Sequence, residues 1–338
     1  MKAKWLLGDA VGVLSYMLGP KALAPLTRTQ FLRLTHVIAQ LRMSSQQAEQ
    51  LAELQALFPE RPASFYLNIQ KESARQRVLN ELEVLRYPLL NSHNIHEICD
   101  VLGQNHLDAA LQKGRGAILM IGHFGANQMI MPALGHRGYV IHQLSAPPTV
   151  WADILPERAN PLWRRKLELR WKLEQSLPVQ HINVFKFLRP AFACLKANAV
   201  LGLAFDGGGG TEWLNIPFLG RQMNLSAQSF QLWQKTKTTL LPTVVLRQSE
   251  QQRHQIIISP PLEWEDAPKP ILHNATRFVE RFSGWVQQFP CHYLPFLQMR
   301  RQVRMTDVQP FFDDYPEHPE ALSPEAAQQR LREAGQQT

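Results

Sequence analysis

The sequence predicts an α/β protein with a mostly parallel central sheet flanked by helices and a helical N-terminal region. Beyond residue 100, short apolar runs typical of buried strands alternate with runs typical of helices, which favours parallel strands joined by crossover helices. From Thr27 to about Leu90, apolar residues recur instead at helical spacing. The predicted strands are 116–122, 138–144, 200–205, 240–246 and 255–259, and the predicted helices are 126–134, 161–175, 187–197, 226–237 and 271–288.

The first residues need a separate interpretation. The stretch from Trp5 to Leu18 is rich in apolar side chains, but Asp9 interrupts it and Pro20 closes it. It is too short to cross a bilayer. An interfacial helix lying on a membrane face and an ordinary core helix are equally compatible with this pattern.

These changes in composition divide the chain into four segments. Residues beyond Asp313 are rich in Asp, Pro, Glu and Gln, which predicts a loosely docked or disordered extension. The segments are a membrane-associating stretch at 1–25, a helical region at 26–98, an α/β domain at 99–312 and a polar tail at 313–338.

Charge and cysteine content limit the classes of partner. The formal net charge is +8, which favours an acidic partner such as nucleic acid, an anionic membrane surface or an acidic carrier protein. The three cysteines, Cys99, Cys194 and Cys291, have no paired spacing, so they predict neither a disulfide framework nor a zinc site. Acidic, histidine and cysteine residues between His93 and Asp100 also lack a metal-ligand spacing, and we expect no metal or cofactor.

A histidine follows the most apolar predicted strand. Gly122-His123-Phe124-Gly125 ends the run from Gly116 to Ile121, which places His123 at a strand's carboxyl end, where open α/β sheets hold their active sites. A lone histidine is more often part of a core or loop. The flanking glycines favour a functional role because they let the backbone and a substrate approach closely.

Three other features of the sequence give weaker indications of function. Asp206 follows a predicted strand and precedes four glycines, but no Gly-Lys-Ser/Thr follows, so we expect a mobile turn that leaves Asp206 exposed. No Gly-x-Ser-x-Gly elbow is present, so a serine hydrolase is unsupported. A basic, aromatic stretch around Trp163 and Arg164 suits nucleic acid, a membrane interface or an acidic protein.

The order of several motifs resembles the late acyltransferases of bacterial lipid A assembly, within the wider lysophospholipid acyltransferase group. That family carries Gly-His-Phe-Gly-Asn-Trp-Glu after a hydrophobic strand, and here residues 122–128 read Gly-His-Phe-Gly-Ala-Asn-Gln. The resemblance covers roughly residues 75 to 304. Its other matching runs are Asn160 to Arg165, Ala204 to Gly207, Ile216 to Arg221, Leu240 to Val245, Trp285 to Pro290, and Arg300-Arg301.

The resemblance implies acyl transfer from a thioester to a hydroxyl, with His123 as the general base. A carboxylate five positions later normally orients the imidazole, but this chain has Gln128 there. An amide can accept a hydrogen bond, yet it cannot offset the charge of an imidazolium. Three cases are therefore open: a slow His123–Gln128 pair, a carboxylate from elsewhere with Asp206 as first choice, or a relative that binds lipid without catalysis.

The resemblance also implies partners and a location. The donor would be acyl carrier protein or acyl-CoA, the acceptor a lipid or lipid-sugar, and the site the cytoplasmic face of the bacterial inner membrane. A non-catalytic protein that binds lipid or acyl carrier protein is the main alternative. A nucleic-acid-binding protein, which rests only on charge and the Trp/Arg stretch, is not expected. The expected substrate-binding residues are Gly125, Asn127, Arg164, Pro217, Phe218, Gly220 and Arg221.

Overall fold

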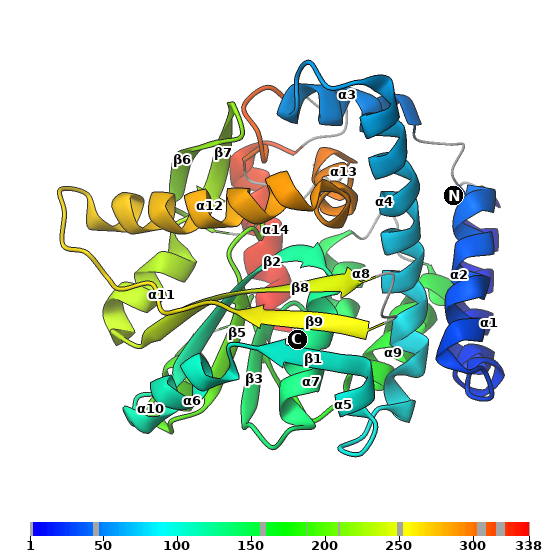
Figure 1. Cartoon of the computed structure of the whole chain (residues 1–338), viewed down its shortest axis with the longest axis horizontal. Coiled ribbons are helices and arrows are strands. Elements are labelled where there is room, and N and C mark those ends of the chain that lie inside the picture. The colour runs from blue at the N-terminus through cyan, green and yellow to red at the C-terminus, as the bar shows by residue number, and fades with distance from the viewer. Residues whose placement is uncertain are drawn as a thin grey trace.

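A computed structural model of the chain has a central parallel sheet with helices on both faces (Figure 1). It describes residues 3–42, 47–155, 160–186, 188–208, 210–248, 253–302, 309–315 and 322–337. In these residues seven strands form one sheet in the order β1-β9-β8-β2-β5-β3-β4. The strands are β1 (Cys99–Leu102), β2 (Ala117–Gly125), β3 (Ile141–Ser145), β4 (Gln180–Asn183), β5 (Val200–Ala204), β8 (Thr239–Gln248) and β9 (Arg253–Ile258).

The sheet confirms the predicted α/β class with mostly parallel strands. Every pair is parallel except β8 and β9, which are antiparallel. All five predicted strands are present, while β1 and β4 were missed because each has only four residues and lies at an edge of the sheet. Such short segments carry too few side chains to show a period.

Strand β2 lies in the middle of the sheet and is buried on both faces. Ile118 and Met120 belong to the hydrophobic cluster on one side, and Leu119 and Ile121 to the cluster on the other. Alternate residues of a strand point to opposite faces, so an unbroken apolar run is what a doubly covered parallel strand requires.

Each of the five helices predicted after residue 100 is present near its expected position, and the described residues contain four that were not predicted, at 104–112, 151–154, 294–302 and 324–337. Helix α7 is shorter than expected because a 3-10 turn, η3 (Asn127–Met129), precedes it. The helices are α6 (Gln104–Gln112), α7 (Ile130–Gly135), α8 (Trp151–Ile154), α9 (Pro161–Glu174), α10 (Arg189–Lys196), α11 (Gln228–Thr236), α12 (Pro270–Gln288), α13 (Leu294–Gln302) and α14 (Pro324–Gln337), with further 3-10 turns η4 (Pro148–Val150) and η5 (Pro290–His292).

The N-terminal region is helical, as predicted. It contains α1 (Ala3–Leu23), α2 (Arg28–Arg42), α3 (Gln47–Leu57), α4 (Ala63–Glu83), the 3-10 turn η2 (Val84–Leu89) and α5 (Ile95–Ile98). A capping box begins α2: Thr27 and Gln30 exchange backbone-to-side-chain hydrogen bonds of 2.9 and 3.2 Å. In Figure 1, α1 and α2 lie at the end of the molecule opposite α10 and α11.

Helix α1 corrects one expectation from the sequence. Pro20 does not close the helix, which continues to Leu23. Asp9 breaks the apolar pattern because it is buried against α9, where its carboxylate pairs with Lys166 at 2.6 Å and accepts from Asn160 at 2.9 Å. No helix in the described part of the chain is both long enough and apolar enough to cross a membrane.

A two-stranded hairpin stands apart from the central sheet. Strands β6 (Trp213–Phe218) and β7 (Arg221–Ser226) pair antiparallel, and Leu219 and Gly220 join them with φ of 48° and 79°. Two positive φ angles are those of a type I′ turn, which matches the twist of the flanking strands.

The polar tail was expected to be loosely docked or disordered, and this is wrong for residues 313–315 and for α14, where Ala327 is fully buried and Arg330 donates to the backbone oxygen of Ile154 at 3.3 Å. Asp313 donates its backbone N–H to Gln222 at 3.2 Å, and its carboxylate accepts from Asn224 at 2.6 Å. Tyr315 is buried. Composition did not reveal this docking because the neighbouring Phe311 and Phe312, both fully buried, supply the apolar contacts just before the acidic run begins.

Candidate active site

The carboxyl ends of β2 and β5 bring two of the predicted site residues together. The strands are adjacent and parallel, and their register pairs Ile121 with Ala204. His123 lies two residues beyond this pair on β2, and Asp206 lies two residues beyond it after β5. Equal displacement from one register pair places both side chains at the same edge of the sheet.

His123 and Asp206 form two hydrogen bonds. The His123 Nδ1 atom lies 2.7 Å from Asp206 Oδ1, and the His123 backbone N–H donates to Oδ2 at 2.9 Å. Asp206 is fully buried, so the expectation that a glycine-rich turn would leave it exposed is wrong. A buried carboxylate requires donors, and the backbone and ring of His123 supply two of them.

Tyr293 supplies a third donor to the same carboxylate. Its hydroxyl donates to Asp206 Oδ2 at 3.0 Å. Burial, together with the charge of Asp206, raises the pKa of Tyr293 well above its usual value of 10. Tyr293 is therefore a neutral donor at any working pH, and it holds the carboxylate through Oδ2, whereas the imidazole contacts Oδ1.

This arrangement fixes the tautomer of His123. An ionised carboxylate only accepts, so Nδ1 must carry the proton that it donates to Asp206. Nε2 is then the nitrogen with a lone pair available to take a proton. The His123 side chain is 39% exposed, so a substrate hydroxyl can reach the ring.

Gln128 is not brought to His123. Its side-chain carbonyl accepts from the Tyr87 hydroxyl at 3.2 Å. Within the described residues, no hydrogen bond joins the Gln128 amide to the imidazole. The carboxylate missing from position 128 is thus present at the site, but it comes from the neighbouring strand.

The glycines around His123 have steric roles. A Cβ on Gly122 would lie 2.6 Å from the ring of Phe282, and a Cβ on Gly125 would lie 2.1 Å from the backbone oxygen of Val245. Gly125 also has a φ of 62°, in the left-handed region. The atoms that approach Gly122 and Gly125 closely therefore belong to other parts of the protein. Asn127, also predicted to bind substrate, lies in the turn η3 directly after the strand.

The remaining predicted substrate-binding residues lie on other elements. Arg164 is on α9, with its guanidinium 3.4 Å from Asp153 at the end of α8. Pro217 and Gly220 belong to the β6–β7 hairpin. Phe218 is buried beneath it, with its ring centroid 6.1 Å from that of Tyr293. Phe218 is therefore the hairpin residue that contacts the site described here.

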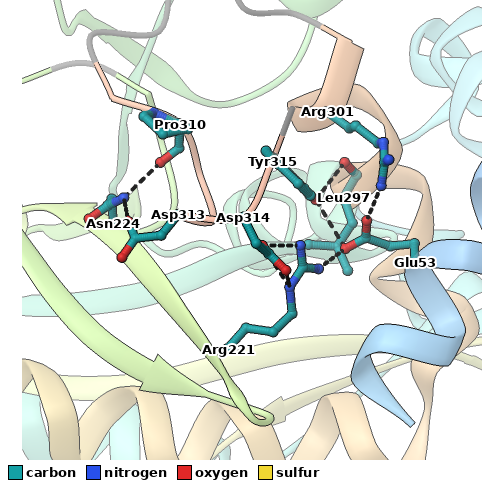
Figure 2. A network of polar contacts seen from close by, with 9 residues as sticks. All are labelled: Glu53, Arg221, Asn224, Leu297, Arg301, Pro310, Asp313, Asp314 and Tyr315. Carbon is teal, nitrogen blue, oxygen red and sulfur yellow. Dashed lines mark hydrogen bonds and ion pairs between the residues drawn. The ribbon is translucent and has the colours of Figure 1, made fainter. Parts of the chain in front are cut away.

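Arg221 is occupied by protein carboxylates. Its guanidinium pairs with Glu53 of α3 and with Asp314 (Figure 2). It also lies over the ring of Phe312, 3.8 Å from the ring centroid. The side chain is only 7% exposed. These contacts neutralise the positive charge of Arg221, and they give this predicted substrate-binding residue a structural role.

Two aromatic residues of the site were not predicted. Tyr293 donates to Asp206, and the ring of Phe296 stacks on that of His123. Both follow α12 in the sequence Phe-Pro-Cys-His-Tyr-Leu-Pro-Phe. Residues three positions apart lie on one face of a helical turn, and this spacing is the sequence feature that could have predicted Tyr293 and Phe296 together. Among the described residues, no cluster of three or more histidine, cysteine or acidic side chains could hold a metal ion.

The fold and the site define an α/β protein with a histidine–carboxylate pair at the carboxyl edge of a parallel sheet, an arrangement suited to general acid–base chemistry. The chain belongs to the bacterial lipid A biosynthesis acyltransferase family, whose model matches residues 5–301. No curated protein sequence matches it significantly.

Proposed function

We propose that this protein is an active acyltransferase that moves a fatty acyl chain from a thioester to a hydroxyl of a lipid or lipid-sugar. Family membership supports the reaction class. The observation that carries the proposal for this chain is the 2.7 Å contact between His123 Nδ1 and Asp206 Oδ1. This contact orients the imidazole of His123 and places a carboxylate beside it, which the amide of Gln128 cannot replace.

In the proposed mechanism, His123 Nε2 takes the proton from the acceptor hydroxyl as its oxygen attacks the thioester carbonyl. The imidazolium that forms is stabilised by the Asp206 carboxylate. When the tetrahedral intermediate collapses, the carbon–sulfur bond breaks, and the imidazolium returns its proton to the departing thiolate. Tyr293 holds Asp206 in place throughout.

The donor and acceptor are proposed from charge and family. Acyl carrier protein and acyl-CoA are both anionic donors, and the chain carries a formal net charge of +8. Opposite net charge speeds the encounter of such partners. The acceptor is proposed to be a membrane lipid, because a lipid A pathway enzyme modifies a lipid.

We further propose that the protein lies on one face of a membrane, at the cytoplasmic side of the inner membrane. The support is a stripe on α1 at helical spacing, formed by Leu7, Val11, Leu14 and Leu18, each more than half exposed. Leu34, Val37 and Leu41 on α2 extend the exposed apolar surface. Apolar surface of this kind suits the interface of a bilayer.

An acyl-transfer assay tests the function. Purified protein is incubated with labelled acyl carrier protein or acyl-CoA and a lipid acceptor fraction, and the acylated product is measured by mass spectrometry. We expect His123→Ala to lose transfer while its circular dichroism matches that of the wild type, and the exposed His93→Ala to retain transfer. Full turnover by His123→Ala would remove His123 from the mechanism.

The non-catalytic alternative predicts a different result. A protein that only binds lipid or acyl carrier protein would show no acylated product with either donor, although it would still bind them. Comparing total lipids from cells with and without the gene then separates the two functions, because only an enzyme leaves an acyl chain missing when it is absent.

A further inference from the structure

The imidazole of His123 lies flat against an aromatic ring. The ring centroids of His123 and Phe296 are 4.6 Å apart and their planes differ by 5°. Phe296 is almost fully buried, so its ring is fixed by its surroundings. A fixed ring on one face restricts rotation of the imidazole about its side chain, and the negative face of the ring favours the imidazolium that forms during proton transfer.

Phe296 is in turn held by a residue from the end of the chain. The edge of Phe311 meets Phe296 at a centroid distance of 5.6 Å and an interplanar angle of 89°. Phe311 is fully buried, and the Arg300 guanidinium lies 5.1 Å from its ring centroid. The orientation of Phe296 therefore depends on the placement of Phe311.

The segment that carries Phe311, residues 310–315, is attached to the hairpin along its length. Asn224 of β7 donates its backbone N–H to Phe311 at 2.8 Å and its side-chain amide to Pro310 at 3.0 Å. Met223 and Phe312 form an antiparallel bridge. Residues 310–313 thus run beside β7 as a short additional strand. We call residues 310–315 the strap.

The far end of the strap is anchored by an ion-pair network around the buried side chains of Arg221 and Glu53 (Figure 2). Arg221 contacts Asp314 through Nε at 3.0 Å and also pairs with Glu53, which accepts from Arg301 at 3.2 Å. The Tyr315 hydroxyl donates to the same Glu53 at 3.0 Å. The network joins α3, the hairpin, α13 and the strap, and so fixes the part of the strap that follows Phe311.

We propose that the strap is a positioning element for the base: through Phe311 it holds Phe296 face to face with the imidazole of His123. The strap lies beyond the residues matched by the family model, which end at 301. The positioning of the His123 ring by the strap does not depend on the proposed function. The effect of the strap on turnover rests on that function.

The geometry is tested by nuclear magnetic resonance of histidine-labelled protein, with the His123 signals assigned from their loss in His123→Ala. Ring protons that lie over an aromatic face resonate upfield. We expect the upfield displacement to vanish in Phe296→Leu and to shrink in Phe311→Leu. Phe230→Leu is the matched control, since Phe230 is equally buried but has its ring contact with Phe278, and it should leave the His123 signals in place.

A second variant keeps the test decisive if Phe311→Leu folds poorly. Asp314→Ala changes a side chain that is 59% exposed, so folding is preserved while one anchor of the strap is lost. It should also reduce the upfield displacement. His123 signals that stay unchanged in Phe311→Leu and Asp314→Ala would overturn the proposal, even if Phe296→Leu alters them.

Turnover provides the second readout. We expect kcat to fall on the order of tenfold to a hundredfold in Phe296→Leu, with a smaller fall in Phe311→Leu and little change in KM, because the base and not substrate binding is displaced. Phe296→Tyr, which keeps the ring face, should restore most of kcat.

A wild type without acyl transfer would refute the proposed function, while the His123 signals would still decide the role of the strap. Unaltered kcat in both leucine variants, with altered signals, would overturn the role of the strap in turnover.

Discussion

Asp206 accepts three hydrogen bonds, two from His123 and one from the Tyr293 hydroxyl. A carboxylate suits this task because both oxygens only accept. An amide offers one oxygen and one NH₂ group, so it leaves at least one of these donors facing another donor. The identity of this one buried residue therefore controls both the tautomer of His123 and the charge beside it.

We expect Asp206→Asn to lower kcat by on the order of 10³- to 10⁴-fold, because the imidazole loses both its charge partner and its correct tautomer. Initial rates of acyl transfer measure the effect. Asp108→Asn, which changes a carboxylate bonded to Tyr139 at 2.5 Å on the surface, serves as the control and should retain wild-type rates. Near-normal turnover in Asp206→Asn would contradict the proposed pair.

A substitution at position 128 is a second test of the His123–Asp206 pair. Gln128→Glu should change kcat by less than about tenfold, equivalent to about 1.4 kcal/mol, because Asp206 already occupies Nδ1 of His123. The measurement is a side-by-side rate comparison with the wild type. A large gain in Gln128→Glu would show that residue 128, and not Asp206, supports the base.

Among the elements, the end of β2 determines the shape of the site. Its register against β8 shifts between Ile121 and Gly125, where the strand departs from β5. Gly125 permits this path because its φ is 62° and the backbone of Val245 passes where a Cβ would lie. A local irregularity at a strand end often serves to aim a side chain, here His123.

Gly125→Ala should destabilise the protein by about 2 kcal/mol or more, because left-handed strain and a backbone clash add together. Gly114→Ala is the matched control: its φ is 71°, but its Cβ would meet nothing within 4 Å. It should cost only about 1 kcal/mol, from strain alone. Urea denaturation of both variants measures the difference, and equal losses would show that the Val245 contact is unimportant.

Buried histidines influence the stability of the whole molecule. Burial, with a smaller contribution from the charge of Arg247, lowers the pKa of His292 to about 3. Burial also lowers the pKa of His254, although Glu83 opposes this. In the unfolded chain these histidines take a proton near pH 6.5. Between that pH and the lower folded value, the unfolded state binds more protons, so stability falls as pH falls.

His292→Gln should reduce the slope of unfolding free energy against pH by about 1.4 kcal/mol per pH unit between pH 6 and pH 4, the value for one proton. Denaturant titrations across this range measure the slope. The exposed His93→Gln should keep the wild-type slope. An unchanged slope in His292→Gln would mean that its folded pKa lies near the ordinary value.

The whole molecule also combines positive charge with the exposed stripe of α1. Attraction to anionic lipid contributes about 1 kcal/mol per basic residue near the surface and is screened by salt. Burial of the stripe contributes roughly 25 cal/mol per Å² and is insensitive to salt. Co-sedimentation with anionic vesicles should therefore weaken only partly at high salt.

Removal of residues 1–20 separates the two contributions. The truncated protein should bind vesicles at low salt and release them at high salt, because only the electrostatic part remains. Leu7→Ser with Leu14→Ser, which leaves the Asp9–Lys166 ion pair intact, should move binding in the same direction. Full-length protein that stays in the supernatant at both salt concentrations would refute the membrane proposal.

The α/β class, the strand that carries His123 and the five predicted helices around the sheet can be inferred from the sequence alone. These are local properties: apolar periodicity reports how each segment is buried, and glycines mark where the chain turns. The same local signal nominated Asp206 as a residue at a strand end, although it did not show that this carboxylate is buried.

Which side chains contact one another at the site depends on how distant segments of the chain pack together. Asp206 lies 83 residues from His123, Tyr293 lies 87 residues beyond Asp206, and Arg221 lies 168 residues from Glu53. Such contacts follow from the order of strands in the sheet and from the docking of the strap, neither of which leaves a periodic trace in the sequence. The sequence therefore favours a substrate-binding role for Arg221, because nothing near it in the chain shows that Glu53 and Asp314 neutralise its charge.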